Sequence, residues 1–300
     1  MNKRFNWQQI FGRCRKNLKT RIKPLLKTLK APQPELGFGA GGDSMKLVDL
    51  AAEKAIVESF LQNDVSFTLV SEESGIKEFG VDPRDYYVTV DPIDGTTNLV
   101  RGLPFYCSSI AVSTAQTSSS VFAASVTDLQ HDVNYMALEG KDAFRGTVKI
   151  APSVTKTLDE AVIGLDLNTF KMKSVAPQLS LLIQETKHIR HFGANALELC
   201  YVADGLTDAF IDIRGKLRAT DVAAAFFILK QAGGIVSSLD GKPIDMKLDP
   251  KETVKFVASG NGEIHDRILS LTKTRKERKC KASYCLTQLV LSKRVKRGLS

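Results

Sequence analysis

The sequence predicts an α+β, or mixed α/β, fold, and three observations support this prediction. Runs rich in β-forming residues, separated by Ser, Asp and Gly, fill residues 104–150 and indicate an antiparallel meander. After Pro152 the chain alternates strand-like and helix-like patterns, which is typical of layered sheets and helices and not of a repeat array. No apolar run reaches the length of a membrane span.

Two helices are expected before the first strand. Apolar residues recur every three or four positions over residues 7–29, which predicts an amphipathic helix perturbed by Pro24. A loop rich in Pro and Gly follows. The next helix is expected over residues 47–60, and Asp43 or Ser44 could provide its N-cap.

The remaining elements follow from the same patterns. Strands are expected at 67–70, 86–90, 106–113, 121–127, 133–138, 143–150, 161–165, 189–192, 208–213 and near Ile235 and Val254. Helices are expected around 179–183, 194–203, 222–232 and 264–271, the last of them capped by Asn261.

Charge is distributed unevenly along the chain. Residues 1–30 contain ten Lys and Arg and no acid, and residues 273–300 contain ten against one acid, so the body between them carries a net charge of −10. An acidic body fits an enzyme that collects divalent cations, whereas the basic ends could contact nucleic acid or an anionic membrane surface. A solvated surface is the simpler interpretation of these ends. Five cysteines without a CxxC pair indicate a reducing, cytoplasmic compartment.

The residues Asp91–Asn98 (DPIDGTTN) form the stretch most suggestive of chemistry. They follow an apolar strand, and Pro92 and Gly95 favour a tight turn from which Asp91 and Asp94 project together. Carboxylate oxygens are the ligands that Mg²⁺ prefers. A plain turn capped by Asp91 would not account for two acids, a glycine and two threonines in one short segment.

This motif resembles the first signature of the inositol monophosphatase family of Mg²⁺-dependent, lithium-sensitive phosphatases. Other stretches match in the expected order: an acidic pair within 71–74, a substrate-contacting helix start at 192–200, and a second signature at 219–225 with 231–235. The resemblance covers roughly residues 36–272. It implies a layered αβαβα sandwich, and we expect a homodimer.

The helical spacing of the first thirty residues, the resemblance over 36–272 and the charge run after residue 272 together imply an organisation of the chain. The parts are a basic N-terminal helix at 1–35, an αβ half with the metal site at 36–150, a second αβ half that completes the site at 151–272, and a basic tail at 273–300.

Metal and catalytic roles carry over by the same resemblance. Two or three Mg²⁺ ions would be held by Glu72, Asp91, the carbonyl of Ile93, Asp94 and Asp221, with Asp43 as an outer contact. Glu72 and Thr96 would position the attacking water, and Asp49 would orient Thr96. Clustered carboxylates repel one another, so without metal at least one of them should have a raised pKa. Asp221 is also a good helix N-cap signal, and capping is compatible with metal binding.

The substrate would lie against a second group of residues. By resemblance, the backbone N–H groups of Gly95 and Thr96 would hold phosphate oxygens, and Ala194, Asn195 and Asp212 would lie near the substrate hydroxyls. The basic pair Arg214 and Arg218 could hold a second phosphate, because a guanidinium binds phosphate oxygens bidentately. A solvated turn is the alternative explanation for this pair.

The sequence therefore predicts a Mg²⁺-dependent phosphatase that hydrolyses phosphate monoesters of small polyols and sugars. The run 208–221 is most similar to archaeal-type enzymes that act on both inositol 1-phosphate and fructose 1,6-bisphosphate. Two alternatives stay open. One is a nucleotidase of the same superfamily that acts on adenosine 3′,5′-bisphosphate. The other is a non-enzymatic nucleic-acid or membrane-surface binder that uses the basic ends, which leaves the acidic set unexplained.

Overall fold

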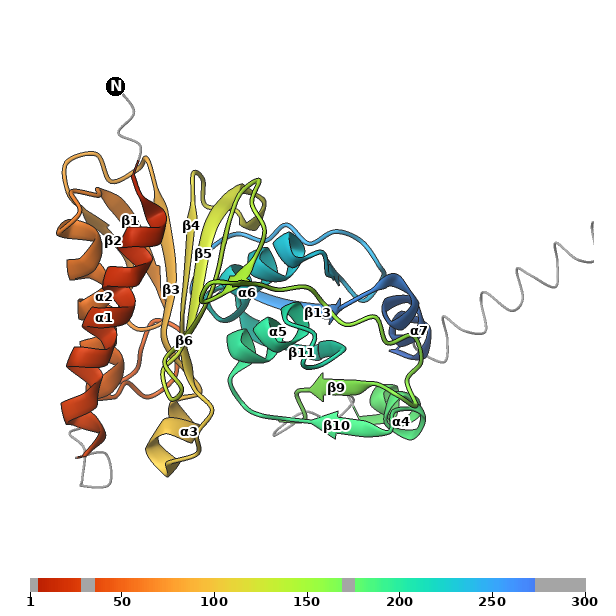
Figure 1. Ribbon diagram of the computed structural model, residues 1–300. Helices are drawn as coiled ribbons and strands as arrows, with labels where there is room; N and C mark the ends of the chain where they lie inside the picture. The colour runs from red at the N-terminus through yellow and green to blue at the C-terminus, as the bar shows by residue number, and fades with distance from the viewer. Residues whose placement is uncertain (1–4, 28–35, 169–175, 273–300) are drawn as a thin grey trace, which may run out of the picture.

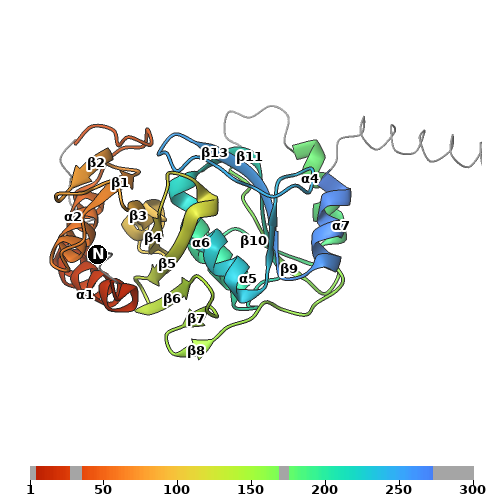
Figure 2. The same cartoon turned by 90° about the horizontal axis from the view of Figure 1, so that it is seen from above.

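The computed structural model of the protein describes residues 5–27, 36–168 and 176–272. Two β-sheets and their helices form five layers in these residues, in the order helix, sheet, helix, sheet, helix (Figures 1 and 2). This arrangement confirms the expected αβαβα sandwich. The basic tail expected at 273–300 lies outside the described residues. No helix among those described is both long and apolar enough to cross a membrane.

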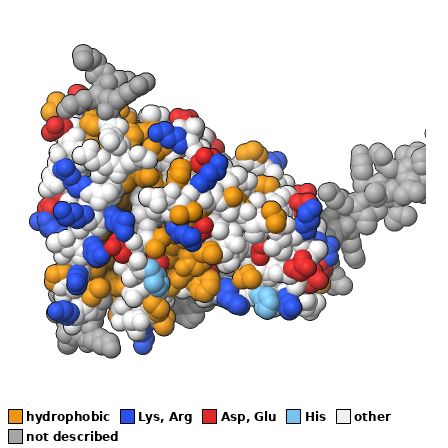
Figure 3. Space-filling view, in the orientation of Figure 1, with side chains coloured by type: hydrophobic (Ala, Val, Ile, Leu, Met, Phe, Trp, Pro, Cys, Tyr) orange, Lys and Arg blue, Asp and Glu red, His pale blue; other side chains and the backbone are white. Residues whose placement is uncertain are grey.

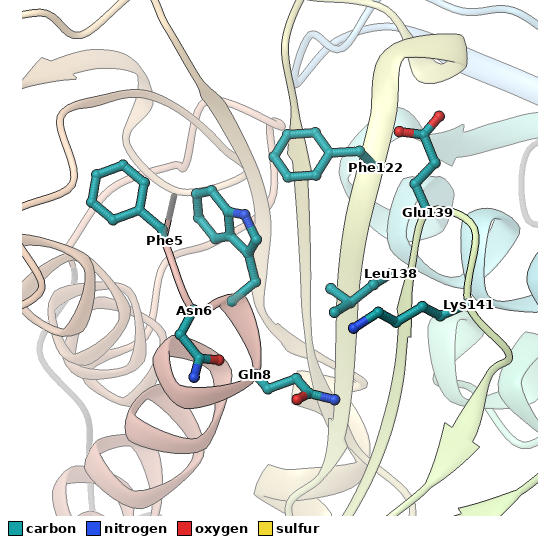
Figure 4. A pocket seen from close by; sticks show the side chains of 8 residues that line it. Phe5, Asn6, Gln8, Phe122, Leu138, Glu139 and Lys141 are labelled. Atoms are coloured by element: carbon teal, nitrogen blue, oxygen red, sulfur yellow. The ribbon is translucent and has the colours of Figure 1, made fainter. Parts of the chain in front are cut away.

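The first layer consists of α1 (Trp7–Leu26) and α2 (Leu47–Leu61). The apolar stripe of α1 is buried against α2 and the first sheet, as its spacing predicted, and Pro24 lies within the last turn of the helix. Aromatic rings anchor the start of α1: the ring centroid of Trp7 lies 5.2 Å from that of Tyr86 and 5.4 Å from that of Phe122. A shallow pocket of about 510 Å³ opens between this helix start and the sheet (Figure 4).

The N-cap expected for α2 was wrong. The cap residue is Lys46, and neither Asp43 nor Ser44 caps the helix with its side chain. The N–H of Lys46 donates instead to the side chain of Asp49, three residues further on. A carboxylate at this position satisfies a helix-start N–H group that would otherwise lack a partner.

The first sheet has eight strands in the order β2-β1-β3-β4-β5-β6-β7-β8. Their bounds are β1 Phe67–Ser71, β2 Gly75–Phe79, β3 Tyr87–Asp94, β4 Cys107–Ser113, β5 Val121–Asp128, β6 Val133–Leu138, β7 Phe144–Arg145 and β8 Val148–Lys149. The short helix α3 (Thr96–Arg101) and the 3₁₀ turn η1 (Ser118–Ser120) interrupt them. The sequence did not predict β2. The single strand expected at 143–150 is a hairpin, because Gly146 turns the chain at a φ of 60°.

The second sheet has the order β10-β9-β11-β13-β12. Its strands are β9 Val162–Leu165, β10 His188–Arg190, β11 Ala209–Arg218, β12 Ile235–Ser237 and β13 Thr253–Ser259. The middle layer contains α5 (Asn195–Ala203) and α6 (Ala219–Ala232), and the outer layer contains α4 (Ala176–Glu185) and α7 (Gly262–Thr272). The expected cap of α7 is confirmed, since Asn261 Oδ1 accepts from the N–H of Ile264 at 3.1 Å. The apolar contacts of α5 and α6 join the two sheets into one core.

Candidate active site

Two carboxylates meet where the parallel pairing of two neighbouring strands ends. β1 and β3 run parallel with Ser71 opposite Val90, so Glu72 and Asp91 leave the same edge of the sheet side by side. The N–H of Glu72 donates to Val90 O at 3.3 Å. Asp221 reaches this edge from the start of α6. Ligand oxygens of Glu72, Asp91 and Asp221 all lie within 4.8 Å of one another.

Asp49 and Asp221 occupy equivalent positions in their helices. Each accepts the N–H of the cap residue three positions earlier, Lys46 at 3.0 Å and Arg218 at 2.8 Å. This bond uses one oxygen of each carboxylate and fixes its orientation. The other oxygen of Asp49 accepts a hydrogen bond from the hydroxyl of Thr96 at 3.3 Å, so the Asp49–Thr96 pair expected from the sequence is present.

Asp94 and Gly95 connect the end of β3 to the start of α5. Asp94 Oδ2 accepts from the N–H of Ala196 at 2.6 Å, at the start of α5, and from the thiol of Cys107 at 3.6 Å. Gly95 has a φ of 86°, and a Cβ there would lie 3.0 Å from the Cβ of Ala194 and 3.1 Å from Phe105 O. Only glycine satisfies both this backbone conformation and this close approach.

The electrostatics of the cluster suit a divalent cation. Asp91 Oδ1 is buried and has no hydrogen-bond partner among the described residues, although buried polar atoms nearly always have one. Burial, as the larger cause, and repulsion from Asp221, as the smaller one, raise the pKa of Glu72 to about 8 and that of Asp94 to about 7. Burial also raises the pKa of Asp91 well above its ordinary value. The expected raised pKa is therefore confirmed, and the oxygen donors present fit Mg²⁺.

These carboxylates line one wall of an open cavity of about 1040 Å³. Ile93, Gly95, Thr96 and Asn195 also line it, in agreement with their expected positions. Ala194 does not line the cavity in the described part of the chain: it is fully buried, and its methyl group packs beneath Gly95. A direct contact between Ala194 and a substrate is therefore not supported.

Asp212 and Arg214 also differ from the expectation. The Asp212 side chain is fully buried, and both of its oxygens accept hydrogen bonds from Arg214. Arg214 is itself 6% exposed and donates in addition to Asp166 and to Asn168 O. Asp212 therefore orients Arg214 and does not reach substrate hydroxyls. Arg214 lines the cavity, but its Nε, Nη1 and Nη2 atoms each donate to a group of the protein, which does not support bidentate binding of a second phosphate.

Arg218 faces the acidic wall and not the wall opposite it. Its Nη1 lies 3.0 Å from Glu72 Oε1, its Nη2 lies 2.5 Å from Asp43 Oδ2, and its Nε lies 3.7 Å from Asp221 Oδ2. These ion pairs place the guanidinium beside the expected metal ligands. The second-phosphate role expected for Arg218 is therefore not supported either. Asp43 itself is mostly exposed and contacts the cluster through Arg218.

Several residues that line the cavity were not assigned a role from the sequence. They are Lys46, Glu73, Arg101, Asp166, His191, Lys216 and Lys251. Glu73 has the clearest signal, since it forms the acidic pair with Glu72, and burial raises its pKa to about 7. The cations carry no signal of their own in the sequence, because the fold brings them to the cavity from different elements: Lys46 caps α2, Arg101 ends α3 and Lys216 lies in β11.

A layered αβαβα sandwich with carboxylates gathered in the wall of an open cavity defines the class of metal-dependent phosphatases. The comparisons with known proteins agree with this class. The chain belongs to the inositol monophosphatase family, whose model matches residues 18–277. It is a phosphoric monoester hydrolase of that family.

Three similar proteins illustrate the relationship. The fructose-1,6-bisphosphatase/inositol-1-monophosphatase of Methanothermobacter thermautotrophicus is 33% identical over 274 residues, which cover 88% of this chain and 96% of that protein. The bifunctional NADP phosphatase/NAD kinase of Methanococcus maripaludis is 31% identical over 276 residues, which cover 85% of this chain and 47% of that protein. The crystal structure of an inositol monophosphatase–fructose 1,6-bisphosphatase superposes with a TM-score of 0.77 at 25% identity, covering 89% of this chain and 100% of the other.

Proposed function

We propose that the protein hydrolyses inositol 1-phosphate and the 1-phosphate of fructose 1,6-bisphosphate in a Mg²⁺-dependent reaction. The observation that carries this proposal is the approach of oxygens from Glu72, Asp91 and Asp221 to within 4.8 Å of one another in the cavity wall. The 33% identity to an archaeal enzyme named for both activities supports the choice of substrates.

Two or three Mg²⁺ ions would be held by Glu72, Asp91, the carbonyl of Ile93, Asp94 and Asp221. When bound, Mg²⁺ lowers the pKa of water and neutralises charge on the phosphoryl group. A bound cation also favours the ionised carboxylates, so it reverses the rise in pKa that burial causes. The backbone N–H groups of Gly95 and Thr96 would bind the phosphate oxygens, and Asn195 would contact substrate hydroxyls.

Thr96 would orient the attacking water. Its hydroxyl has one proton, and two acceptors lie within reach: Ile93 O at 2.8 Å and Asp49 Oδ1 at 3.3 Å. With its own proton donated to either acceptor, Thr96 Oγ1 keeps lone pairs that can accept a hydrogen bond from water. Glu72 would accept a hydrogen bond from the other O–H of that water. Two acceptors at fixed positions aim the oxygen of the water at phosphorus.

A nucleotide-directed reaction is the second candidate, because a relative named as an NADP phosphatase is 31% identical to this chain.

A binder that acts through its basic ends has weaker support. Lys and Arg side chains do gather over α1, where Lys16, Lys23 and Lys27 are exposed (Figure 3). Such a surface does not explain why carboxylates are buried at the sheet edge.

A phosphate-release assay tests the proposal. The purified protein is given inositol 1-phosphate, fructose 1,6-bisphosphate, adenosine 3′,5′-bisphosphate and NADP, each with Mg²⁺ and with EDTA. We expect release from the first two substrates with Mg²⁺, inhibition by lithium, and none in EDTA. Release from the nucleotides alone would favour the second candidate, and full activity in EDTA would refute the metal assignment.

A further inference from the structure

The guanidinium of Arg218 contacts the same carboxylates that form the candidate metal site. Of the three residues whose oxygens converge, it forms ion pairs with two, at 3.0 Å from Glu72 and 3.7 Å from Asp221. The Arg218 side chain is 15% exposed, so water screens these charges only partly. A positive charge fixed within the protein therefore interacts with oxygens that a divalent cation also requires.

The loop over Arg218 leaves the guanidinium little room on that side. The N–H groups of Ala40 and Gly41 donate to the carbonyls of Glu73 at 2.9 Å and Glu72 at 2.8 Å, which holds the loop against the end of β1. A Cβ added to Gly41 would lie 1.9 Å from Arg218 Nη1. The guanidinium thus lies between the backbone of Gly41 and the side chain of Glu72. It cannot leave Glu72 toward the loop without moving that loop.

We propose that Arg218 is an internal competitor for the metal: a divalent cation that binds Glu72 and Asp221 must displace or repel the guanidinium. The inference rests on the metal site of the proposed function and adds a residue that tunes its affinity. Arg218 neutralises the clustered carboxylates and thereby weakens their hold on Mg²⁺. Loss of the Arg218 charge should therefore tighten Mg²⁺ binding, whereas loss of a residue that helps to hold the metal should weaken it.

Calorimetric titration with Mg²⁺, without substrate, measures this competition. The full chain is stripped with EDTA, dialysed, and compared with Arg218→Met and Arg218→Lys. Arg218→Met should bind Mg²⁺ about tenfold more tightly or better, because charges a few ångströms apart interact appreciably even when water screens them. Arg218→Lys keeps the charge and should stay within roughly threefold of the wild type. Unchanged or weaker binding in Arg218→Met would overturn the competition.

A matched control separates local from general charge effects. Lys19→Met removes one positive charge from α1, where the Lys19 side chain is 59% exposed and paired with Asp132. Its charge lies outside the cavity, so salt should screen it and Mg²⁺ affinity should not change. If Lys19→Met tightened binding as much as Arg218→Met, net charge and not competition would be the cause.

A second measurement does not require Arg218→Met to fold. The Nε–H resonance of Arg218 in the wild type, assigned by its absence from Arg218→Lys, is followed by NMR as Mg²⁺ is added. The resonance should shift with the same dissociation constant that calorimetry gives. An unchanged resonance at saturating Mg²⁺ would refute the inference while leaving the proposed function intact. Absence of Mg²⁺ binding by the wild type would refute both.

Discussion

Replacing Arg214 with Met should lower the free energy of unfolding by about 3–5 kcal/mol, the usual cost of removing one partner from a buried ion pair. The Arg214 Nε lies 2.9 Å from Asp212 Oδ1, and Nη2 donates to both Asp212 and Asp166. The side chains of Arg214, Asp212 and Asp166 are 2%, 0% and 8% exposed. The substitution therefore leaves two buried carboxylates without their counter-charge, and water reaches neither well enough to compensate.

Urea unfolding of the two proteins gives this difference directly. Lys251→Met is the matched control, because Lys251 also lines the cavity but is exposed, and its loss should change stability by less than about 0.5 kcal/mol. Kinetic assays give a second result. Arg214 orients the cavity wall through Asp166, so Arg214→Met should affect inositol 1-phosphate and fructose 1,6-bisphosphate equally.

An Arg214→Met protein as stable as the wild type would show that the two buried carboxylates do not depend on the Arg214 charge. A rise in KM for the bisphosphate alone would show that Arg214 binds a second phosphate after all, since losing a contact to a non-reacting group changes mainly affinity.

Three further predictions follow from the site. Asp94→Asn and Asp221→Asn should each reduce kcat by at least about a hundredfold while circular dichroism stays unchanged, because each removes charge from the metal site; turnover like the wild type would contradict this. The raised pKa values of Glu72 (about 8) and Asp94 (about 7) mean that Mg²⁺ must displace protons, so its affinity should rise from pH 6 to pH 8 by about tenfold per pH unit for each proton released. Flat affinity over this range would contradict the pKa assignment. Deleting residues 273–300 should leave activity and the thermal transition unchanged, because the last described helix ends at Thr272; a lost transition would show that the boundary is misplaced.

Metal removal has a defined effect on stability. A carboxyl group whose pKa is higher in the folded protein than in the unfolded chain destabilises the folded state as pH rises from the unfolded to the folded pKa. Without metal, the thermal midpoint of unfolding should therefore decrease as the pH is raised from 5 to 8. Saturating Mg²⁺ should restore it, and most strongly at pH 8. A metal-free midpoint that rises over this range would contradict the burial of Glu72 and Asp94.

The positions of the acids could be predicted from the sequence because strand ends are local features. Glu72 and Asp91 each follow an apolar run, and parallel pairing of β1 with β3 brings them to one edge. Asp49 and Asp221 are the third residues of α2 and α6, a position at which an acid stabilises a helix start whether or not it binds metal. The resemblance to a family, and not the spacing, supplied their chemical roles.

The partners of the basic residues could not be predicted in the same way. Arg214 pairs with Asp166, which lies 48 positions earlier in the sequence, directly after β9 and before α4, β10 and α5. Arg218 pairs with Asp43, 175 positions away. Only the packing of the two sheets decides whether such a guanidinium faces a carboxylate or an open cavity. The basic run 214–218 therefore predicted phosphate binding, whereas in the fold both of its arginines form ion pairs with carboxylates of the protein.

The proposed function depends on the cluster of Glu72, Asp91 and Asp221 to hold the Mg²⁺ that hydrolysis requires. The most direct measurement is phosphate release from inositol 1-phosphate across a range of Mg²⁺ concentrations by the wild type and by Asp91→Asn. Asp91 contributes a buried oxygen that has no other partner among the described residues, so we expect Asp91→Asn to need far more Mg²⁺ and to reach a much lower maximal rate. Identical Mg²⁺ dependence and identical maximal rates in the two proteins would contradict this role of the cluster.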